Sequence, residues 1–231
     1  MKKIITLAVV ALFATIPTLA QSHYGGIPPR NPYAYENHHH RWGRGYFEND
    51  LYFGFRIGPA FSRVSSGDKH LDGGSTTTDL HLGAVVGLGI TRSAPVFFET
   101  GLSYVGKGGK GNNDFNKNYT FDLNYLELPL TFKYIYYMDN GMSIHPFLGG
   151  YLAVGVGGKI KNFADRESYD SFGGDADQFK RFDGGLRFGC GVGYNIFYAD
   201  LCYDLGLANI CHDSFDTAQN RTFYFNVGVN F

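Results

Sequence analysis

Strict alternation of apolar with polar or small residues is the feature that most constrains how this chain folds. In the segment Thr222–Phe231 every second residue is apolar, namely Phe223, Phe225, Val227, Val229 and Phe231. A β-strand directs successive side chains to opposite faces, so this segment predicts a ribbon with one apolar and one polar face. Taken alone, the segment fits an outer-membrane strand and the edge strand of a soluble sandwich equally well.

Further segments repeat this pattern from Leu51 onward. They are the ranges 52–62, 80–90, 96–107, 125–136, 143–157, 181–194 and 197–206. With the last segment they make eight predicted strands, and an even number lets a closed antiparallel barrel begin and end on the same side. A composition with Gly 32, Tyr 17 and Phe 21 favours such a strand-rich fold over a helical one.

The connections between the predicted strands alternate in length. The short links are 91–95, 137–142 and 195–196, and the long polar links are 65–79, 108–120, 158–180 and 208–221. One rim of tight turns and one rim of long loops is typical of outer-membrane barrels, which keep the short turns in the periplasm. The run Lys107–Gly111 lacks the spacing of a phosphate-binding loop, so we interpret it as the flexible base of the second long loop.

The polar faces of the predicted strands carry many charged residues. Each would cost several kcal/mol in the core of a soluble sandwich unless it were paired, whereas a barrel lumen can pair and hydrate them. We therefore predict an all-β fold, an eight-stranded antiparallel up-and-down transmembrane β-barrel whose apolar face contacts lipid. The predicted charge network in the lumen consists of Arg56, Glu99, Glu127, Lys133, Arg181, Asp183, Arg187, Asp200 and Asp204.

A soluble secreted barrel that holds an apolar ligand, as lipocalins do, is the alternative fold. In that barrel the apolar face would point inward and the charged face outward. A requirement for detergent would separate the two, because only a lipid-facing barrel needs it.

The N-terminal part of the chain has a different character. Residues 1–20 combine Lys2 and Lys3, an apolar run and a small-residue exit at Ala20, which predicts a cleaved secretory signal peptide. Residues 21–50 are rich in Pro, Gly, Tyr and His without a period and predict a disordered periplasmic tail, so the barrel domain spans 51–231. Export places the barrel in the bacterial cell outer membrane. The formal net charge of −1 gives no reason to expect a nucleic-acid partner.

The lumen face includes residue types that are used in catalysis, among them His81, His145, Asp183, Asp200 and Asp204. Their spacing matches neither a nucleophile elbow nor a paired-carboxylate hydrolase. We therefore expect no enzymatic activity, no cofactor and no metal site. We expect a charge-paired network that fills a lumen too narrow for an open pore.

Cys190, Cys202 and Cys211 are odd in number for an exported chain, so at least one is expected to lack an internal partner. Cys190 falls on the apolar face and Cys202 on the polar face, which argues against a bond between them. A Cys202–Cys211 disulfide is the remaining alternative, and it requires the fourth long loop to fold back.

Several strand segments resemble a known family. The segments are Gly54–Gly58, Glu99–Gly108, Asn124–Leu130, Gly191–Tyr194 and Tyr203–Leu207, and Tyr125-Leu126-Glu127-Leu128-Pro129 is the most specific of the motifs. They are similar to the PorT-like outer-membrane β-barrel proteins of Bacteroidetes-type bacteria. The resemblance implies an eight-stranded barrel that the barrel-assembly machinery inserts through the C-terminal strand. Phe223, Phe225, Val227, Val229 and Phe231 would then form the assembly signal, and deleting Phe231 would lower the amount inserted.

The resemblance implies no reaction. We expect a structural or interaction role in which long extracellular loops meet a protein or polysaccharide partner, while the barrel wall contacts outer-membrane lipid. The alternative is a component of an outer-membrane secretion or assembly system, since the founding member of the PorT-like family takes part in type IX secretion.

Overall fold

The structure is a computed structural model that describes residues 51–66, 75–91, 94–112, 118–139, 141–161, 167–174, 178–212 and 217–231. The described residues up to Asn230 belong to one compact unit, Phe47–Asn230. The predicted signal peptide and periplasmic tail lie outside the described residues.

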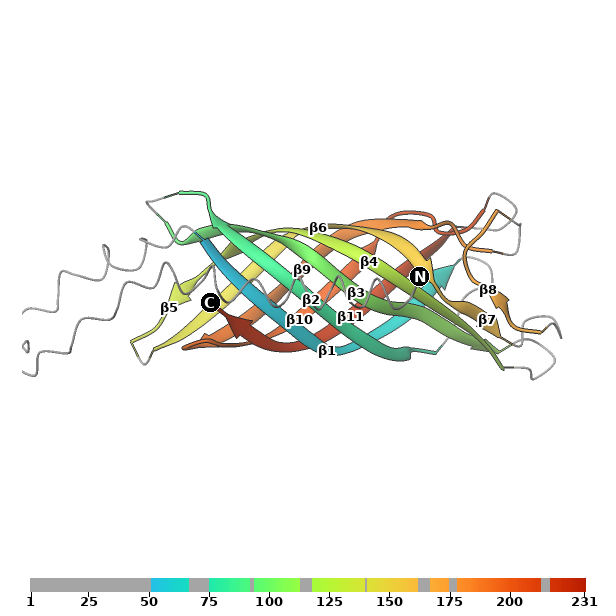
Figure 1. Cartoon of the computed structure of the whole chain (residues 1–231), viewed down its shortest axis with the longest axis horizontal. Helices are drawn as coiled ribbons and strands as arrows, with labels where there is room; N and C mark the ends of the chain where they lie inside the picture. The colour runs from blue at the N-terminus through green and yellow to red at the C-terminus, as the bar shows by residue number, and fades with distance from the viewer. Residues whose placement is uncertain are drawn as a thin grey trace, which may run out of the picture. The chain divides into compact units, whose positions relative to one another are not determined.

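Long antiparallel strands form a closed barrel (Figure 1). They are β1 (Leu51–Ser66), β2 (Thr77–Gly89), β3 (Val96–Asn112), β4 (Asn118–Tyr134), β6 (Met142–Gly157), β9 (Phe182–Tyr194), β10 (Phe197–Gly206) and β11 (Ala218–Asn230). Three short strands, β5 (Tyr136–Tyr137), β7 (Lys159–Lys161) and β8 (Tyr169–Asp170), extend the ends of the barrel. Each long strand pairs with its neighbours in sequence, and the pairings of β1 with β11 and of β4 with β6 close the ring. The predicted eight-stranded antiparallel barrel is confirmed.

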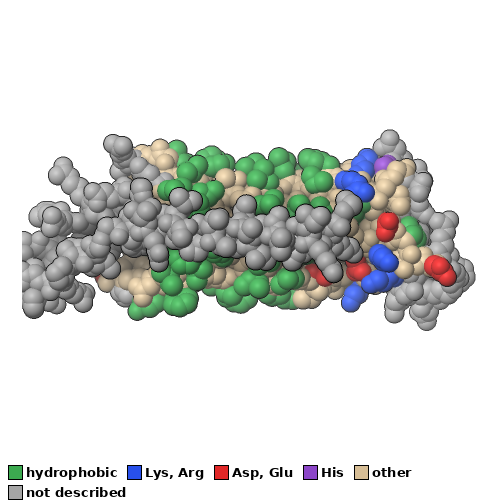
Figure 2. All heavy atoms as spheres, viewed as in Figure 1, with side chains coloured by type: hydrophobic (Ala, Val, Ile, Leu, Met, Phe, Trp, Pro, Cys, Tyr) green, Lys and Arg blue, Asp and Glu red, His purple; other side chains and the backbone are tan. Residues whose placement is uncertain are grey.

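The two faces of the strands differ as the alternation predicts. Leu148 and Phe197 on the outer face are 62% and 63% exposed, whereas Lys107 and Glu127 on the inner face are 0% exposed. Figure 2 shows hydrophobic side chains along the barrel wall, with charged side chains gathered at the end that carries β7 and β8. The outer face therefore forms an apolar band, and the inner face holds the charges.

Three prolines, Pro59, Pro129 and Pro146, lie inside long strands, and at Pro59 and Pro129 the ladder is interrupted on one side only. Around Pro129 the β3–β4 register passes from Thr100↔Leu130 to Ser103↔Glu127 without the pairs between them, although Pro129 still opposes Tyr151 of β6. Proline has no backbone N–H, so it cannot donate to one of its two neighbouring strands. Pro59 produces the same gap between β1 and β11 while it keeps its pairing with β2.

The gap at Pro59 adjoins a close backbone approach that only glycine permits. A Cβ atom on Gly58 would lie 1.9 Å from the backbone oxygen of Phe225. We expect Gly58→Ala to lower the free energy of unfolding by about 1–3 kcal/mol, because the β1–β11 seam must move apart to admit the methyl group. Urea unfolding in lipid vesicles measures this. Gly157→Ala is the matched control because its Cβ would meet nothing within 4 Å, and equal stability of both variants would contradict the prediction.

The strands at the loop end are longer than the sequence predicted. β3 runs to Asn112 and β4 begins at Asn118, so most of the predicted link 108–120 is a paired hairpin. The interpretation of Lys107–Gly111 as a flexible loop base is therefore wrong. The strand continues there because Gly108, at φ 140°, lets its backbone pass close to that of Phe121. β11 likewise begins at Ala218 and ends at Asn230, so Phe231 follows the strand.

Candidate functional site

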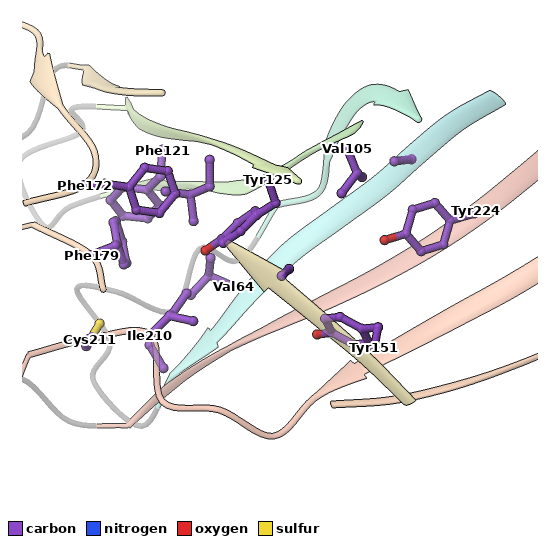
Figure 3. Packing of buried hydrophobic residues seen from close by; sticks show 14 of the residues in the cluster. Val64, Val105, Phe121, Tyr125, Tyr151, Phe172, Phe179, Ile210, Cys211 and Tyr224 are labelled. Atoms are coloured by element: carbon purple, nitrogen blue, oxygen red, sulfur yellow. The ribbon is translucent and has the colours of Figure 1, made fainter. Parts of the chain in front are cut away.

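The lumen at the loop end is covered by an apolar cluster, which we call the cap (Figure 3). Strands contribute Val64, Phe121, Tyr125 and Ala218, and the long connections contribute Ile160, Phe172, Phe179, Ile210 and Cys211. The ring of Phe179 contacts Phe121 edge-on at 5.4 Å between centroids, and Phe172 meets Tyr125 in the same way at 5.3 Å. Burying one such phenylalanine contributes about 1.5–3 kcal/mol, so the cap holds the loops in place.

Backbone hydrogen bonds join the two connections that form the cap. The amide of Lys180 donates to the carbonyl oxygen of Ile210 at 2.7 Å, and the amide of Ile210 donates to Ala218 at 3.0 Å. Outside the cap, the exposed Lys161 ammonium lies 2.8 Å from Asp122, and this hydrogen bond and charge raise the pKa of Lys161. The parts of the long connections that the structure describes therefore fold over the barrel mouth, and the links predicted as long and polar also bury apolar side chains there.

Below the cap lies the central cluster of buried charges, formed by Lys107, Glu127, Asp183, Arg187 and Asp204. The Lys107 ammonium lies 2.7 Å from Glu127, 3.4 Å from Asp183 and 3.6 Å from Asp204. The Arg187 guanidinium donates two bonds of 2.7 Å to Asp204 and a third to Glu127. Two cations thus hold three carboxylates, and the bidentate arginine fixes their positions.

Neutral side chains surround the central cluster and complete its bonding. The Tyr224 hydroxyl donates to Asp204 at 2.7 Å, and the Asn220 amide donates to Asp183 at 3.0 Å. The Tyr151 ring lies 4.0 Å from the Lys107 ammonium and offers it a cation–π contact. Buried charges with this many partners are held in one arrangement, because any lost partner would leave a charge unpaired.

Nearer the end with the short turns lies a second group, the turn-end cluster of Arg56, Glu99, Lys133 and Asp200. The Lys133 ammonium and the Tyr52 hydroxyl both donate to Glu99 at 2.5 Å. The Arg56 guanidinium lies 3.7 Å from Glu99 and 3.9 Å from Asp200, and it stacks over the Tyr198 ring at 3.9 Å. Glycines on the inner face of β9 leave room for these rings, since a Cβ on Gly191 would lie 2.3 Å from the Tyr198 hydroxyl.

Two neutral residues connect the clusters. The Asn226 amide donates to Asp200 at 2.8 Å, and its oxygen lies 2.7 Å from Nδ1 of His81, which is in donor position. The His81 ring in turn packs edge-on against Tyr224 at 5.1 Å, and Tyr224 belongs to the central cluster. Hydrogen bonds and one ring contact therefore connect the two clusters along the lumen below the cap.

The structure brings together all but one of the predicted lumen residues. Glu127, Asp183, Arg187 and Asp204 lie in the central cluster, and Arg56, Glu99, Lys133 and Asp200 lie in the turn-end cluster. The predicted place of Arg181 in the lumen is wrong, because Arg181 precedes β9, is exposed and donates to the backbone oxygen of Gly155 at 3.1 Å. The predicted assembly residues Phe223, Phe225, Val227 and Val229 lie on the outer face of β11, and Phe231 is exposed.

The predicted network omitted Lys107 and the polar neutral residues. Lys107 shares the inward parity of Glu99 on β3, and that parity was a usable signal, but the neighbouring glycines suggested a loop. Tyr52, Tyr198 and Tyr224 also occupy inward positions of their strands. Their hydroxyls could not be assigned to a network by sequence because tyrosine occurs equally at membrane interfaces.

The residues considered for catalysis take part in several different contacts. His81 bonds Asn226, whereas His145 lies 2.7 Å from the hydroxyl of Ser143 on its own strand. The His145 ring also packs edge-on against Tyr198 at 5.3 Å, and its Nδ1 is buried without a hydrogen-bond partner. Asp200 accepts a hydrogen bond from Asn226, and Asp183 and Asp204 are held in the central cluster. Among the described residues, no acid therefore orients the Ser143–His145 pair.

The cysteines keep the predicted separation of faces. Cys190 is exposed on the outer face of β9, and Cys202 is buried on the inner face of β10 as a free thiol. Cys211 is buried in the cap. The Cys202–Cys211 disulfide, which the sequence left as an alternative, is therefore not formed.

The closed ring, the apolar outer band and the charged, filled interior define the class of this protein as an integral β-barrel of the outer membrane. Among the described residues, no helix has the length and apolar character needed to cross a bilayer. The chain belongs to the family of the outer membrane protein beta-barrel domain, whose model matches residues 31–212. The protein is therefore a bacterial outer-membrane β-barrel protein.

Solved structures with a similar barrel come from several bacteria. Neisserial surface protein A has a TM-score of 0.43 and 14% identity, covering 79% of this chain and 96% of that one. Ail of Yersinia pestis, solved in complex with the heparin analogue sucrose octasulfate, has a TM-score of 0.39 and 14% identity, covering 79% and 100%. OprG of Pseudomonas aeruginosa has a TM-score of 0.43 and 11% identity, covering 78% and 95%. No curated protein matches the chain.

Proposed function

We propose that this barrel is an interaction protein of the cell surface, with neither an open pore nor a catalytic activity. The observation that carries the proposal is the filled interior, in which the cap and both charge clusters occupy successive levels of the lumen. A barrel of eight strands leaves an interior just wide enough for side chains. With the lumen occupied, the loop end is the part of the molecule left to meet a partner.

The loop end supports this role because the cap gives it a rigid base. Phe172, Phe179 and Ile210 anchor both long connections inside the mouth. Exposed charged residues of both signs surround them, among them Lys159, Lys161 and Asp170. A preorganised base lowers the ordering cost of binding, which suits a protein or polysaccharide partner outside the cell.

Membership of the PorT-like group, and with it a part in a secretion or assembly system, is the second candidate. The motif Tyr125-Leu126-Glu127-Leu128-Pro129 supports it. In this barrel the motif supplies Tyr125 to the cap, Glu127 to the central cluster and Pro129 to the interrupted ladder. These are roles inside the barrel, so the motif favours a shared architecture more directly than a shared partner.

The same proposal includes assembly through β11. The outward row Phe223, Phe225, Val227 and Val229 would be read by the barrel-assembly machinery before the seam with β1 closes. The strand is suited to this because its apolar row is continuous and its inward residues pair only when the barrel has formed.

Conductance separates an interaction protein from a pore. Purified protein in a planar lipid bilayer is expected to give no current steps above the bare membrane, since the lumen is filled. A porin reconstituted in the same bilayer is the control. Regular current steps that depend on the amount of inserted protein would contradict the proposal.

Cross-linking in whole cells tests the interaction directly. A photo-reactive residue at the exposed Lys159 is expected to capture a surface partner, and one at the lipid-facing Leu148 is not. Capture of periplasmic secretion components in place of a surface partner would favour the PorT-like candidate.

A further inference from the structure

Two arginines form an unusual pair on the outer face of the barrel. Arg63 of β1 and Arg221 of β11 lie directly opposite each other in the ladder that closes the ring. Both point outward, because their neighbours Val64 and Thr222 are buried in the interior. Arg63 is exposed, and Arg221 is half-buried.

The aromatic residues beside this pair indicate its depth in the membrane. The next outward pair toward the barrel centre is Phe61 and Phe223, whose ring centroids lie 6.4 Å apart. Tyr203 of β10 opposes Phe223 and continues the aromatic row. Aromatic rows mark the boundary between acyl chains and headgroups in membrane barrels, so the arginines lie at headgroup level on the loop side.

Within the described part of the chain, the charges of the pair are not matched by a carboxylate. Like charges directly opposite each other in a ladder are destabilising. Among the residues that the structure describes, no carboxylate pairs with either guanidinium, and Nε of Arg221 is buried without a hydrogen-bond partner. Elsewhere the chain pairs its buried cations, as with Arg187 and Asp204 at 2.7 Å. The pair therefore carries charge that the described carboxylates do not balance, and the exposed side chain of Arg63 is open to an anion.

We propose that Arg63 and Arg221 bind the phosphate group of an anionic lipid in the outer leaflet. Guanidinium groups present planar forks that match phosphate oxygens, and one phosphate between the two would remove their repulsion. A lipid fits better than a soluble anion because the apolar row of Phe61, Phe223 and Tyr203 begins directly below the pair and offers a surface to the acyl chains. This lipid site goes beyond the proposed surface interaction and does not depend on it.

Native mass spectrometry of the full chain in a non-ionic detergent tests the proposal. The probes are dioleoyl phosphatidic acid, dioleoyl glycerol, which lacks the phosphate, and inorganic phosphate. Wild-type protein is expected to retain phosphatidic acid, and R63Q/R221Q is expected to retain about tenfold less or lower, since two charge-assisted contacts are lost. R63K/R221K is expected to be intermediate, because lysine keeps the charge but loses the fork.

The matched control is K110Q/K159Q, which removes two exposed cations from the same end of the barrel. It is expected to retain phosphatidic acid like wild type, and heat-dependent gel migration reports the folding of every variant. Equal loss in K110Q/K159Q would overturn the proposal in favour of general attraction. If dioleoyl glycerol were retained as well as phosphatidic acid, the proposed role of the phosphate group would be wrong. If inorganic phosphate competed as well as phosphatidic acid, the proposed preference for a lipid would be wrong. If R63Q/R221Q does not fold, the lysine variant decides the outcome. R63K/R221K that binds phosphatidic acid as tightly as wild type would then overturn the proposal.

Discussion

Replacing Lys107 with methionine is expected to lower the free energy of unfolding by about 3–5 kcal/mol, because breaking a buried ion pair leaves an uncompensated charge. Lys107 is fully buried and contacts Glu127, Asp183 and Asp204. Without it, Arg187 would still contact Glu127 and Asp204, and Asp183 would lose its ion pair. Methionine keeps most of the volume, so the loss reports charge and not a cavity. Urea unfolding of the refolded barrel in lipid vesicles measures the change.

Lys110→Met is the matched control, since Lys110 lies on the same strand and is exposed. It is expected to change the free energy by about 0.5 kcal/mol at most. Adding Asp183→Asn to Lys107→Met is expected to recover part of the loss, because it removes one of the carboxylates left unpaired. A Lys107→Met variant as stable as the Lys110→Met variant would show that the central cluster does not hold the lumen together.

Replacing Leu148 with arginine is expected to cost about 2–4 kcal/mol, the cost of a cation on the lipid face near the bilayer centre. Leu148 is 62% exposed near the middle of β6, and its cross-strand neighbours are Phe132 and Phe188. Exposed leucines on a soluble barrel would tolerate the same change. The folded fraction after refolding into lipid vesicles, read by heat-dependent gel migration, measures it.

Val156→Arg is the control for depth. Val156 faces outward near the loop end of the same strand, where the cost is expected to fall to about 0–1 kcal/mol. A similar loss of folded fraction in the Leu148→Arg and Val156→Arg variants would mean that arginine disturbs β6 itself. No loss of folded fraction in either variant would contradict the prediction that Leu148 contacts the acyl chains.

The alternation of residues located the strands and their faces well. It placed Asp200 and Asp204 on the inner face of β10 and Leu201 on the outer face, as the structure has them. This worked because a strand has a fixed period of two, so parity alone assigns a face. It failed at Arg181, which shares the inward parity of Asp183 but precedes β9, and at Lys107–Gly111, where glycines in a paired hairpin resembled a loop.

The cap could not be predicted in the same way. Phe172, Phe179 and Ile210 lie in connections that have no regular alternation of apolar and polar residues. No sequence pattern therefore predicted that these side chains point into the barrel. Their burial depends on the width of the barrel mouth and on the apolar residues Val64 and Phe121 that face it. The composition of these connections predicted long polar loops. The few apolar residues among them were the only sequence feature that did not fit this prediction.

The alternation of residues alone predicts a barrel with an apolar wall and a charged interior, because both properties are local and repeat along every strand. The tertiary structure decided which charges meet. Arg187 reaches Glu127 across 60 positions of sequence, and Arg63 stands beside Arg221 only because β1 and β11 close the ring. Strand register and barrel closure determine such contacts, and the alternation of residues within one strand predicts neither of them.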